Sequence, residues 1–196
     1  MKEINKFFKI VLVLFLFFST KAESKILTIG NLDAKVTVKV FSSLTCPHCA
    51  EFHEVVFNKL KDEYIDKDLV KFEHHAFPLD LAALNAELVI RCQTNNDKKF
   101  ELLEEIYKKQ TEWAVGSDIN KINNLIKKIG LDFDLTENKM DECLKNSEAQ
   151  DEILNQRIKA QKQYKIEATP TIFINEKKYS GKVDYKSFKK IIEKNL

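Results

Sequence analysis

The chain has 196 residues, which is enough for one domain, or for one domain with an insertion, whose core needs no disulfide to hold it together. Hydrophobic residues make up 44% of the sequence and charged residues 32%, with only four glycines and three prolines, so the composition is typical of a helix-rich globular protein and excludes fibrous and low-complexity classes. The net charge of +2 comes from the first 22 residues, which hold four lysines and one glutamate, so the remainder has no basic field for nucleic acid.

Residues 1–22 have the pattern of a secretory signal peptide. Lysines precede an apolar run over residues 10–18, and the small residues Thr20 and Ala22 suit cleavage after Ala22. The run of about nine apolar residues is short of the roughly 20 that a membrane-spanning helix needs, so an uncleaved anchor is the weaker interpretation. The four cysteines beyond this segment suit an oxidising compartment, and we expect export to the bacterial periplasm.

The next part of the chain predicts strands that flank one helix. The expected strands, rich in β-branched side chains, span residues 26–29, 36–41 and 69–77. The helix is expected to begin at Cys46, with Thr45 in the capping position and Pro47 in the first turn, where its missing N–H does no harm. Pro78 ends the third strand.

A long helical block follows, and then the strand pattern returns. The helices expected in the block span residues 81–93, 97–113, 118–129 and 135–146. The elements expected after it are a helix over 148–164, strands over 171–175 and 177–179, and a helix over 185–194. This order predicts an α/β fold in which residues 23–78 and 148–196 form one domain and residues 79–147 form an inserted helical domain.

The segment Cys46-Pro47-His48-Cys49 follows a strand and opens a helix. Unpaired N–H groups and the helix dipole favour an anion there, so we expect Cys46 to be an acidic thiol and the nucleophile. Cys49 lies one helical turn further on, where it can attack a mixed disulfide formed at Cys46. His48 can place imidazole donors near the Cys46 sulfur and favour its thiolate, which would make the disulfide form a stronger oxidant.

A Cys-x-x-Cys segment can also be half of a zinc site or a structural disulfide. Zinc usually takes four ligands, and no second such pair or spaced histidine pair accompanies this one. His74 and His75 are adjacent on an expected strand, so only one of them could join any site. We therefore expect redox chemistry at Cys46 and Cys49, with no metal and no cofactor.

Three segments carry a resemblance to a known family. Residues 41–49, Phe-Ser-Ser-Leu-Thr-Cys-Pro-His-Cys, resemble the active-site segment of the DsbA-like thiol-disulfide oxidoreductases of the thioredoxin superfamily. Residues 75–80 resemble the segment that ends the family's central strand, and residues 167–175 resemble its cis-proline loop and the following strand. The resemblance covers essentially the whole mature chain and implies a thioredoxin-like fold with an inserted helical domain.

The resemblance also implies roles for residues outside the Cys-x-x-Cys segment. It implies that Pro170 is cis and faces the active-site disulfide, and that the backbone of Thr169 pairs with the substrate peptide. One departure concerns a buried acid that many family members carry six residues before the first cysteine, where this chain has Val40. Without that acid, proton handling at Cys49 falls to water or to another group.

Cys92 and Cys143 both fall in the helical block. Some DsbA-like proteins of α-proteobacteria resemble this chain in having an extra disulfide there, and an oxidising compartment favours such a bridge. The alternative is two separate buried thiols. Trp113 and His53, by contrast, are expected to be packing residues rather than parts of the site.

The function expected from these residues is donation of the Cys46–Cys49 disulfide to reduced, unfolded exported proteins. The resemblance implies a membrane quinone-linked DsbB-like partner as the source of reoxidation. One alternative is a reductase or isomerase that uses the same cysteines, and the reduction potential would separate it. Another is a non-catalytic thioredoxin-fold binding or chaperone module with structural cysteines, which accessibility of the thiols would separate.

Overall fold

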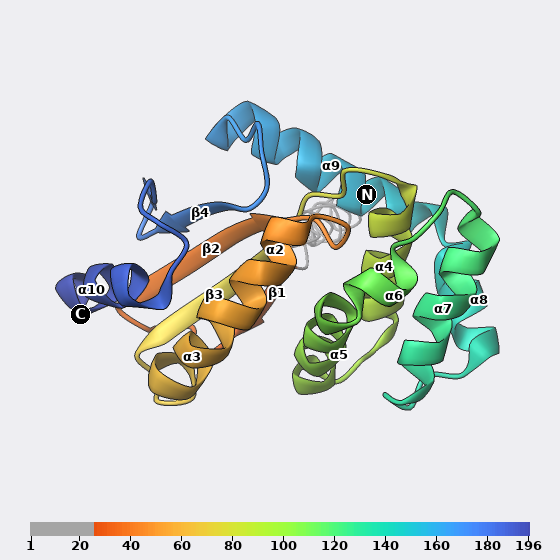
Figure 1. The fold of residues 1–196 in the computed structure, drawn as a ribbon, viewed down its shortest axis with the longest axis horizontal. Coiled ribbons are helices and arrows are strands. Elements are labelled where there is room, and N and C mark those ends of the chain that lie inside the picture. Colours follow the sequence, from red (N-terminus) through yellow and green to blue (C-terminus); the bar gives the residue numbers. More distant parts are fainter. Residues whose placement is uncertain (1–25) are drawn as a thin grey trace, which may run out of the picture.

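The computed structural model describes residues 26–196, which fold around a five-stranded sheet of order β1-β3-β2-β4-β5 (Figure 1). The strands are β1 (Leu27–Ile29), β2 (Val36–Ser42), β3 (Val70–Ala76), β4 (Thr171–Ile174) and β5 (Lys177–Lys178). Strands β2 and β3 are parallel, and the other neighbouring pairs are antiparallel. This arrangement confirms the expected thioredoxin-like fold. The expected signal peptide, residues 1–22, lies outside the described residues.

Strand β2 is the central strand of the sheet, with β3 on one side and β4 on the other. Val38 lies opposite Phe72 of β3 and Ile174 of β4, and all three side chains are buried. The β-branched residues of β2 suit this position, since they pack well on a pleated surface. The strand therefore gives a rigid base to the segment that follows Ser42.

One long helical run follows β2 and packs on the sheet. Its parts are α2 (Pro47–Phe52), η1 (His53–Phe57), α3 (Asn58–Leu60) and η2 (Lys61–Ile65), and the two η stretches are π-helical. Phe57 contacts Phe72 of the sheet, with 4.6 Å between the ring centroids. The prediction that Thr45 caps this helix is wrong: Cys46 holds the N-cap position, and the Thr45 hydroxyl instead donates to Asp80 Oδ2 at 2.7 Å.

The helical block lies beside the sheet, and α9 leads from it back to β4 (Figure 1). Its helices are α4 (Leu81–Cys92), α5 (Asn96–Lys108), α6 (Gln110–Trp113), α7 (Ile119–Leu131) and α8 (Glu137–Leu144), followed by α9 (Ser147–Tyr164), and α10 (Tyr185–Asn195) closes the chain. The prediction of one helix over residues 97–113 is wrong, because the chain leaves helical geometry at Lys109 (φ −93°, ψ 14°). Trp113 is buried, and its Nε1 donates to Ile106 O at 2.8 Å.

Short polar side chains fix where most of these helices begin. In each case an oxygen of the N-cap side chain accepts a hydrogen bond from an N–H of the first turn, which typically stabilises a helix by about 1 kcal/mol. The capping residues are Asp80 of α4, Asn95 of α5, Asp118 of α7, Thr136 of α8, Asn146 of α9 and Asp184 of α10. Helix α2 has no such cap.

A disulfide joins the two ends of the helical block. Cys92, the last residue of α4, is bonded to Cys143 of α8, and the two cysteines are 51 positions apart in the sequence. The loop that this bond closes holds α5, α6 and α7. Such a link restricts the unfolded chain by much more than the folded one.

Replacing both Cys92 and Cys143 by serine should lower the free energy of unfolding by about 4 kcal/mol, the loop-closure value for a loop of this length. Urea unfolding without reductant measures this difference, with Cys46 and Cys49 replaced by serine in both forms so that no free thiol exchanges with the bond. The reference form is therefore the Cys46→Ser, Cys49→Ser protein, which keeps the Cys92–Cys143 bond. Equal stability of the two forms would show that the bond does not constrain the unfolded chain.

Candidate active site

The two cysteines of the Cys-x-x-Cys segment lie at the start of α2 in unequal surroundings. Cys46 is the N-cap residue and retains 8% exposure, whereas Cys49 is fully buried one turn further on. Both are free thiols in this structure. Because only Cys46 reaches the surface, an incoming thiol or disulfide can meet Cys46 but not Cys49.

The surroundings of Cys46 lower the pKa of its thiol from 9.0 to about 5. The largest cause is a hydrogen bond from the Cys49 thiol, and burial opposes it. Thr169 and the backbone N–H groups of Cys49 and His48 lower the pKa further. Helix α2 has no capping side chain that would compete with the sulfur for these N–H groups, and the Cys49 N–H also donates to Cys46 O at 3.0 Å. The Cys46 sulfur is therefore a thiolate at neutral pH.

Cys49 has the opposite tendency. Burial raises the pKa of its thiol well above the usual range, and the neighbouring Cys46 sulfur raises it further. The Ser42 side chain and the backbone of Ser43 act in the other direction through hydrogen bonds. The pair thus consists of one acidic, accessible thiol and one shielded thiol that keeps its proton, which is the division of properties that stepwise disulfide exchange requires.

The loop before β4 brings Thr169 and Pro170 to Cys46. The Thr169–Pro170 peptide bond is cis, and the Thr169 carbonyl oxygen lies 3.3 Å from the Cys46 sulfur, although the two residues are 123 positions apart in the sequence. Antiparallel pairing of β4 with β2, in which Thr171 lies opposite Phe41, produces this approach. The structure therefore gathers Cys46, Cys49, Thr169 and Pro170 at one place.

His48 contributes to the site in a different way from the one expected. Its ring is largely exposed, and Nδ1 lies 3.3 Å from Glu51 Oε2 rather than on the Cys46 sulfur. The part of His48 that favours the Cys46 thiolate is its backbone N–H. Pro47 occupies the first helical position, where its lack of an N–H costs no hydrogen bond.

The helical block supplies site residues that no sequence motif indicated. Gln110, at the start of α6, donates from Nε2 to Leu44 O at 2.7 Å and to Cys46 O at 3.1 Å. Tyr107 of α5 places its hydroxyl 2.8 Å from the Ser42 hydroxyl beneath Cys49. The structural feature that sets these residues apart is the break in the predicted helix at Lys109. Sequence periodicity does not show such a break, so no sequence signal pointed to them.

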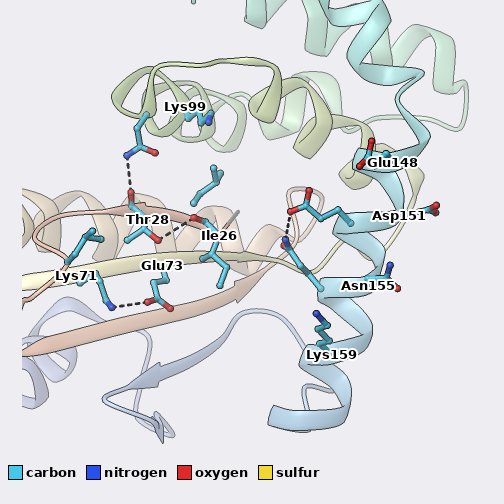
Figure 2. Close-up of a pocket in the computed structure, with 14 residues that line it drawn as sticks. Ile26, Thr28, Lys71, Glu73, Lys99, Glu148, Asp151, Asn155 and Lys159 are labelled. Atoms are coloured by element: carbon cyan, nitrogen blue, oxygen red, sulfur yellow. Dashed lines mark hydrogen bonds and ion pairs between the residues drawn. The ribbon is translucent and has the colours of Figure 1, made fainter. Parts of the chain in front are cut away.

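A cavity of about 1280 Å³ lies away from the cysteines, between β1, the start of α5 and α9 (Figure 2). Its walls carry side chains of both charges, including Lys71 and Glu73, whose charged atoms are 3.2 Å apart. None of the residues that line it belongs to the cysteine site.

Within residues 26–196, no group of three or more His, Cys, Asp or Glu side chains could hold a metal ion. None of the helices there has the length and apolar character that crossing a membrane requires.

Comparison with known proteins places the chain among redox proteins. A family model described as Thioredoxin matches residues 22–194. The chain is 32% identical over 177 residues to disulfide bond formation protein D of Bacillus subtilis, across 86% of this chain and 76% of that protein. It is 28% identical over 155 residues to a protein of Rickettsia bellii named as a protein-disulfide oxidoreductase, across 79% of this chain but only 59% of that longer protein.

Two crystal structures extend this similarity to the fold. The structure of alpha-DsbA1 of Wolbachia pipientis is 26% identical, with a TM-score of 0.80 over 87% of this chain and 90% of that one. The structure of oxidised BdbD of Bacillus subtilis is 25% identical, with a TM-score of 0.75 over 87% of this chain and 92% of that one.

The acidity of Cys46 gives a direct prediction. Alkylation of the reduced protein by iodoacetamide should follow a single titration with its midpoint near pH 5, which Cys46→Ser abolishes. Because the folded pKa lies below the ordinary value of 9.0, the thiolate stabilises the reduced fold fully above pH 9, and this stabilisation is lost as the pH falls through about 5. The stability difference between the reduced protein and Cys46→Ser should therefore shrink from pH 9 to pH 5. A midpoint near the ordinary value of 9.0 would contradict the assignment.

Proposed function

Because this chain belongs to the thioredoxin family and is DsbA-like, we propose that it is an exported thiol-disulfide oxidoreductase that donates its Cys46–Cys49 disulfide to reduced client proteins. The observation that carries the proposal is the contrast between an acidic, accessible Cys46 and a buried Cys49 beside the Thr169–Pro170 loop. Cys46, Pro47, His48 and Cys49 form the catalytic segment, and Thr169 and Pro170 form the client-binding loop.

The reaction proceeds in two exchange steps. A client thiolate attacks the Cys46 sulfur of the oxidised protein, which forms a mixed disulfide and releases Cys49 with the electron pair of the broken S–S bond. A second client thiolate then attacks the client sulfur of the mixed disulfide and releases Cys46 as a thiolate. The client is oxidised to a disulfide, two electrons pass to Cys46 and Cys49, and Cys49 takes up one proton.

The acidity of Cys46 favours the oxidising direction. A thiolate of low pKa is a good leaving group in the second step, and its stability favours the reduced state of the pair. The disulfide state is correspondingly a strong oxidant. The opposite direction, used by reductases, would instead call for a Cys46 pKa closer to the ordinary value.

The client binds as an extended segment beside Cys46. The Thr169 carbonyl lies 3.3 Å from the Cys46 sulfur, and Pro170 offers no N–H to compete with a client backbone. A client strand that pairs with the Thr169 backbone would hold its own cysteine against the Cys46 sulfur. Backbone pairing of this kind accepts many sequences, which suits reduced, unfolded clients.

The compartment and the partner follow from the same proposal. An oxidant of this type acts in the periplasm, where exported clients arrive reduced, and the amino-terminal segment of residues 1–22 would direct it there. After each cycle the Cys46 and Cys49 thiols must be oxidised again, and a membrane quinone-linked DsbB-like protein is the proposed electron acceptor. The match covers only part of the longer Rickettsia protein. The clients and the DsbB-like acceptor are therefore proposed for this chain and are not transferred from that relative.

The reduction potential of the Cys46–Cys49 pair tests the direction of the reaction. Equilibration in glutathione buffers, with Cys92 and Cys143 replaced by serine to isolate the signal, should give a value near the roughly −120 mV of strong disulfide donors. The stable Cys46 thiolate is the physical reason. A value near the −270 mV of thioredoxin would identify a reductase instead.

Single substitutions test the assigned roles. Cys46→Ser should abolish oxidation of a reduced client, because no sulfur remains for the client to attack. Cys49→Ser should accumulate mixed disulfides between Cys46 and small thiols, because no internal thiol remains to release them. Mass spectrometry after acid quenching measures both outcomes. Mixed disulfides that accumulate in Cys46→Ser and not in Cys49→Ser would contradict the roles.

A further inference from the structure

The proposed reaction releases a sulfur anion in a place that disfavours it. Cys49 has 0% exposure, and it must carry the electron pair of the broken S–S bond as soon as a client attacks Cys46. An unpaired charge in such a place is costly unless donors are already directed at it. The position six residues before Cys46 offers no help, because Val40 is an apolar side chain that is itself fully buried.

Two groups next to Cys49 favour the anionic form of its sulfur. They are the hydroxyl of Ser42, the last residue of β2, and the backbone N–H of Ser43, and each lowers the pKa of the Cys49 thiol through hydrogen bonding. Ser42 and Ser43 are 0% and 1% exposed, so water does not weaken these bonds. The end of the central strand therefore presents two donors to the sulfur that leaves.

The Ser42 hydroxyl needs a partner of its own to serve in this way. A serine hydroxyl carries one hydrogen, so while it donates to sulfur its oxygen can accept from another donor. Tyr107 of α5 meets this need, because its hydroxyl lies 2.8 Å from the Ser42 hydroxyl and can donate to it. Burial raises the pKa of Tyr107 well above its usual range, and Cys49 is the next cause, so the phenol keeps its proton.

The ring of Tyr107 is held in place by His53. The two rings are stacked with 4.3 Å between centroids and 26° between planes, and both side chains are buried. His53 begins the π-helical stretch η1, and irregular turns of this kind are frequent at functional sites. Burial, followed by the nearby His74, lowers the pKa of His53, so the stacked ring is neutral and adds no competing charge.

We propose that Ser42 and the Ser43 backbone N–H form an anion site for the Cys49 sulfur, and that Tyr107 is the positioning residue that orients the Ser42 hydroxyl toward it. This inference rests on the proposed exchange reaction and deepens it. As the client S–S bond forms at Cys46 and the Cys46–Cys49 bond breaks, the electron pair passes to Cys49 and is met by the Ser42 O–H and the Ser43 N–H. The proton that Cys49 finally binds comes from solvent.

Two variants remove parts of this anion site without removing a cysteine. Tyr107→Phe deletes one hydroxyl and keeps the stacked ring, and Ser42→Ala deletes the hydroxyl that faces the sulfur. The matched control is Tyr64→Phe, which also deletes one tyrosine hydroxyl, here one that donates to Glu193 Oε1 at 3.2 Å away from the cysteines. Thermal unfolding of each variant establishes that it is folded.

The exchange between glutathione and the oxidised protein is followed by quenched-flow mass spectrometry at pH 7. Two rate constants are measured, one for attack of glutathione on Cys46 and one for return attack of Cys49 on the mixed disulfide. Ser42→Ala and Tyr107→Phe should slow attack on Cys46 about tenfold, which is the effect of losing one hydrogen bond to a charged group. They should slow the return attack of Cys49 on the mixed disulfide by a similar factor, because both directions share one transition state. The equilibrium constant should change by less than about threefold, and Tyr64→Phe should leave both rates unchanged.

Other outcomes have separate meanings. Unchanged rates in both folded variants would overturn the anion site. A tenfold fall in the equilibrium constant with an unchanged return rate would also overturn it, because the hydroxyls would then stabilise the reduced state rather than the transition state. Failure of the proposed oxidase function would instead appear in the unsubstituted protein, as a thioredoxin-like potential, while the ratio of variant to unsubstituted rates would still test Ser42 and Tyr107.

Discussion

The start of helix α2 carries a cysteine sulfur where the other long helices of residues 26–196 carry a capping oxygen. Asp, Asn or Thr side chains satisfy the first N–H groups of α4, α5 and α7 to α10, whereas α2 begins at Cys46 with no side-chain cap. At α2, the first N–H groups therefore stabilise the Cys46 thiolate as well as the helix. The reactivity of the site depends on the low pKa of this sulfur, which comes first from the hydrogen bond of the Cys49 thiol and further from these N–H groups.

Preserving that geometry requires parts of the chain that are far apart in sequence. Strand β4 pairs with β2 and sets the Thr169 carbonyl beside the Cys46 sulfur. From the opposite side, Gln110 of the helical block bonds the carbonyls of Leu44 and Cys46 and fixes the turn that leads into α2. The helical block thus contributes contacts to the site itself. The Cys92–Cys143 bond, which closes the block, holds α5 and α6 within one constrained loop.

The fold could be predicted from sequence because its signals are local. The β-branched run of β2, the Cys-Pro-His-Cys segment and the Thr-Pro before β4 each occupy a few adjacent residues, and they lie where the patterns indicated. Gln110, Tyr107 and Ser42 could not be found in this way. Their roles arise from side chains that meet only in the folded chain, across 65 positions for Ser42 and Tyr107, and a glutamine or tyrosine in a helix has the same pattern whether it packs or bonds. Thr45 misled for a similar reason, since its hydroxyl bonds Asp80 across the fold instead of capping its own helix.

Val40 and the hydroxyls near Cys49 together leave no carboxylate at position 40 to repel the Cys49 thiolate and provide donors that favour it. A buried carboxylate at that position could accept the Cys49 proton, but once ionised it would repel the Cys49 thiolate that the exchange step creates. Hydroxyl and N–H donors cannot remove the proton, yet they favour the anion and never oppose it. Among the buried side chains of residues 26–196, the carboxyl group is that of Glu87 on α4, which is bonded at 2.6 Å to His74, the residue opposite Val40 in the sheet. The fold therefore pairs this carboxyl group with His74 and leaves neutral donors to face the sulfur that must leave.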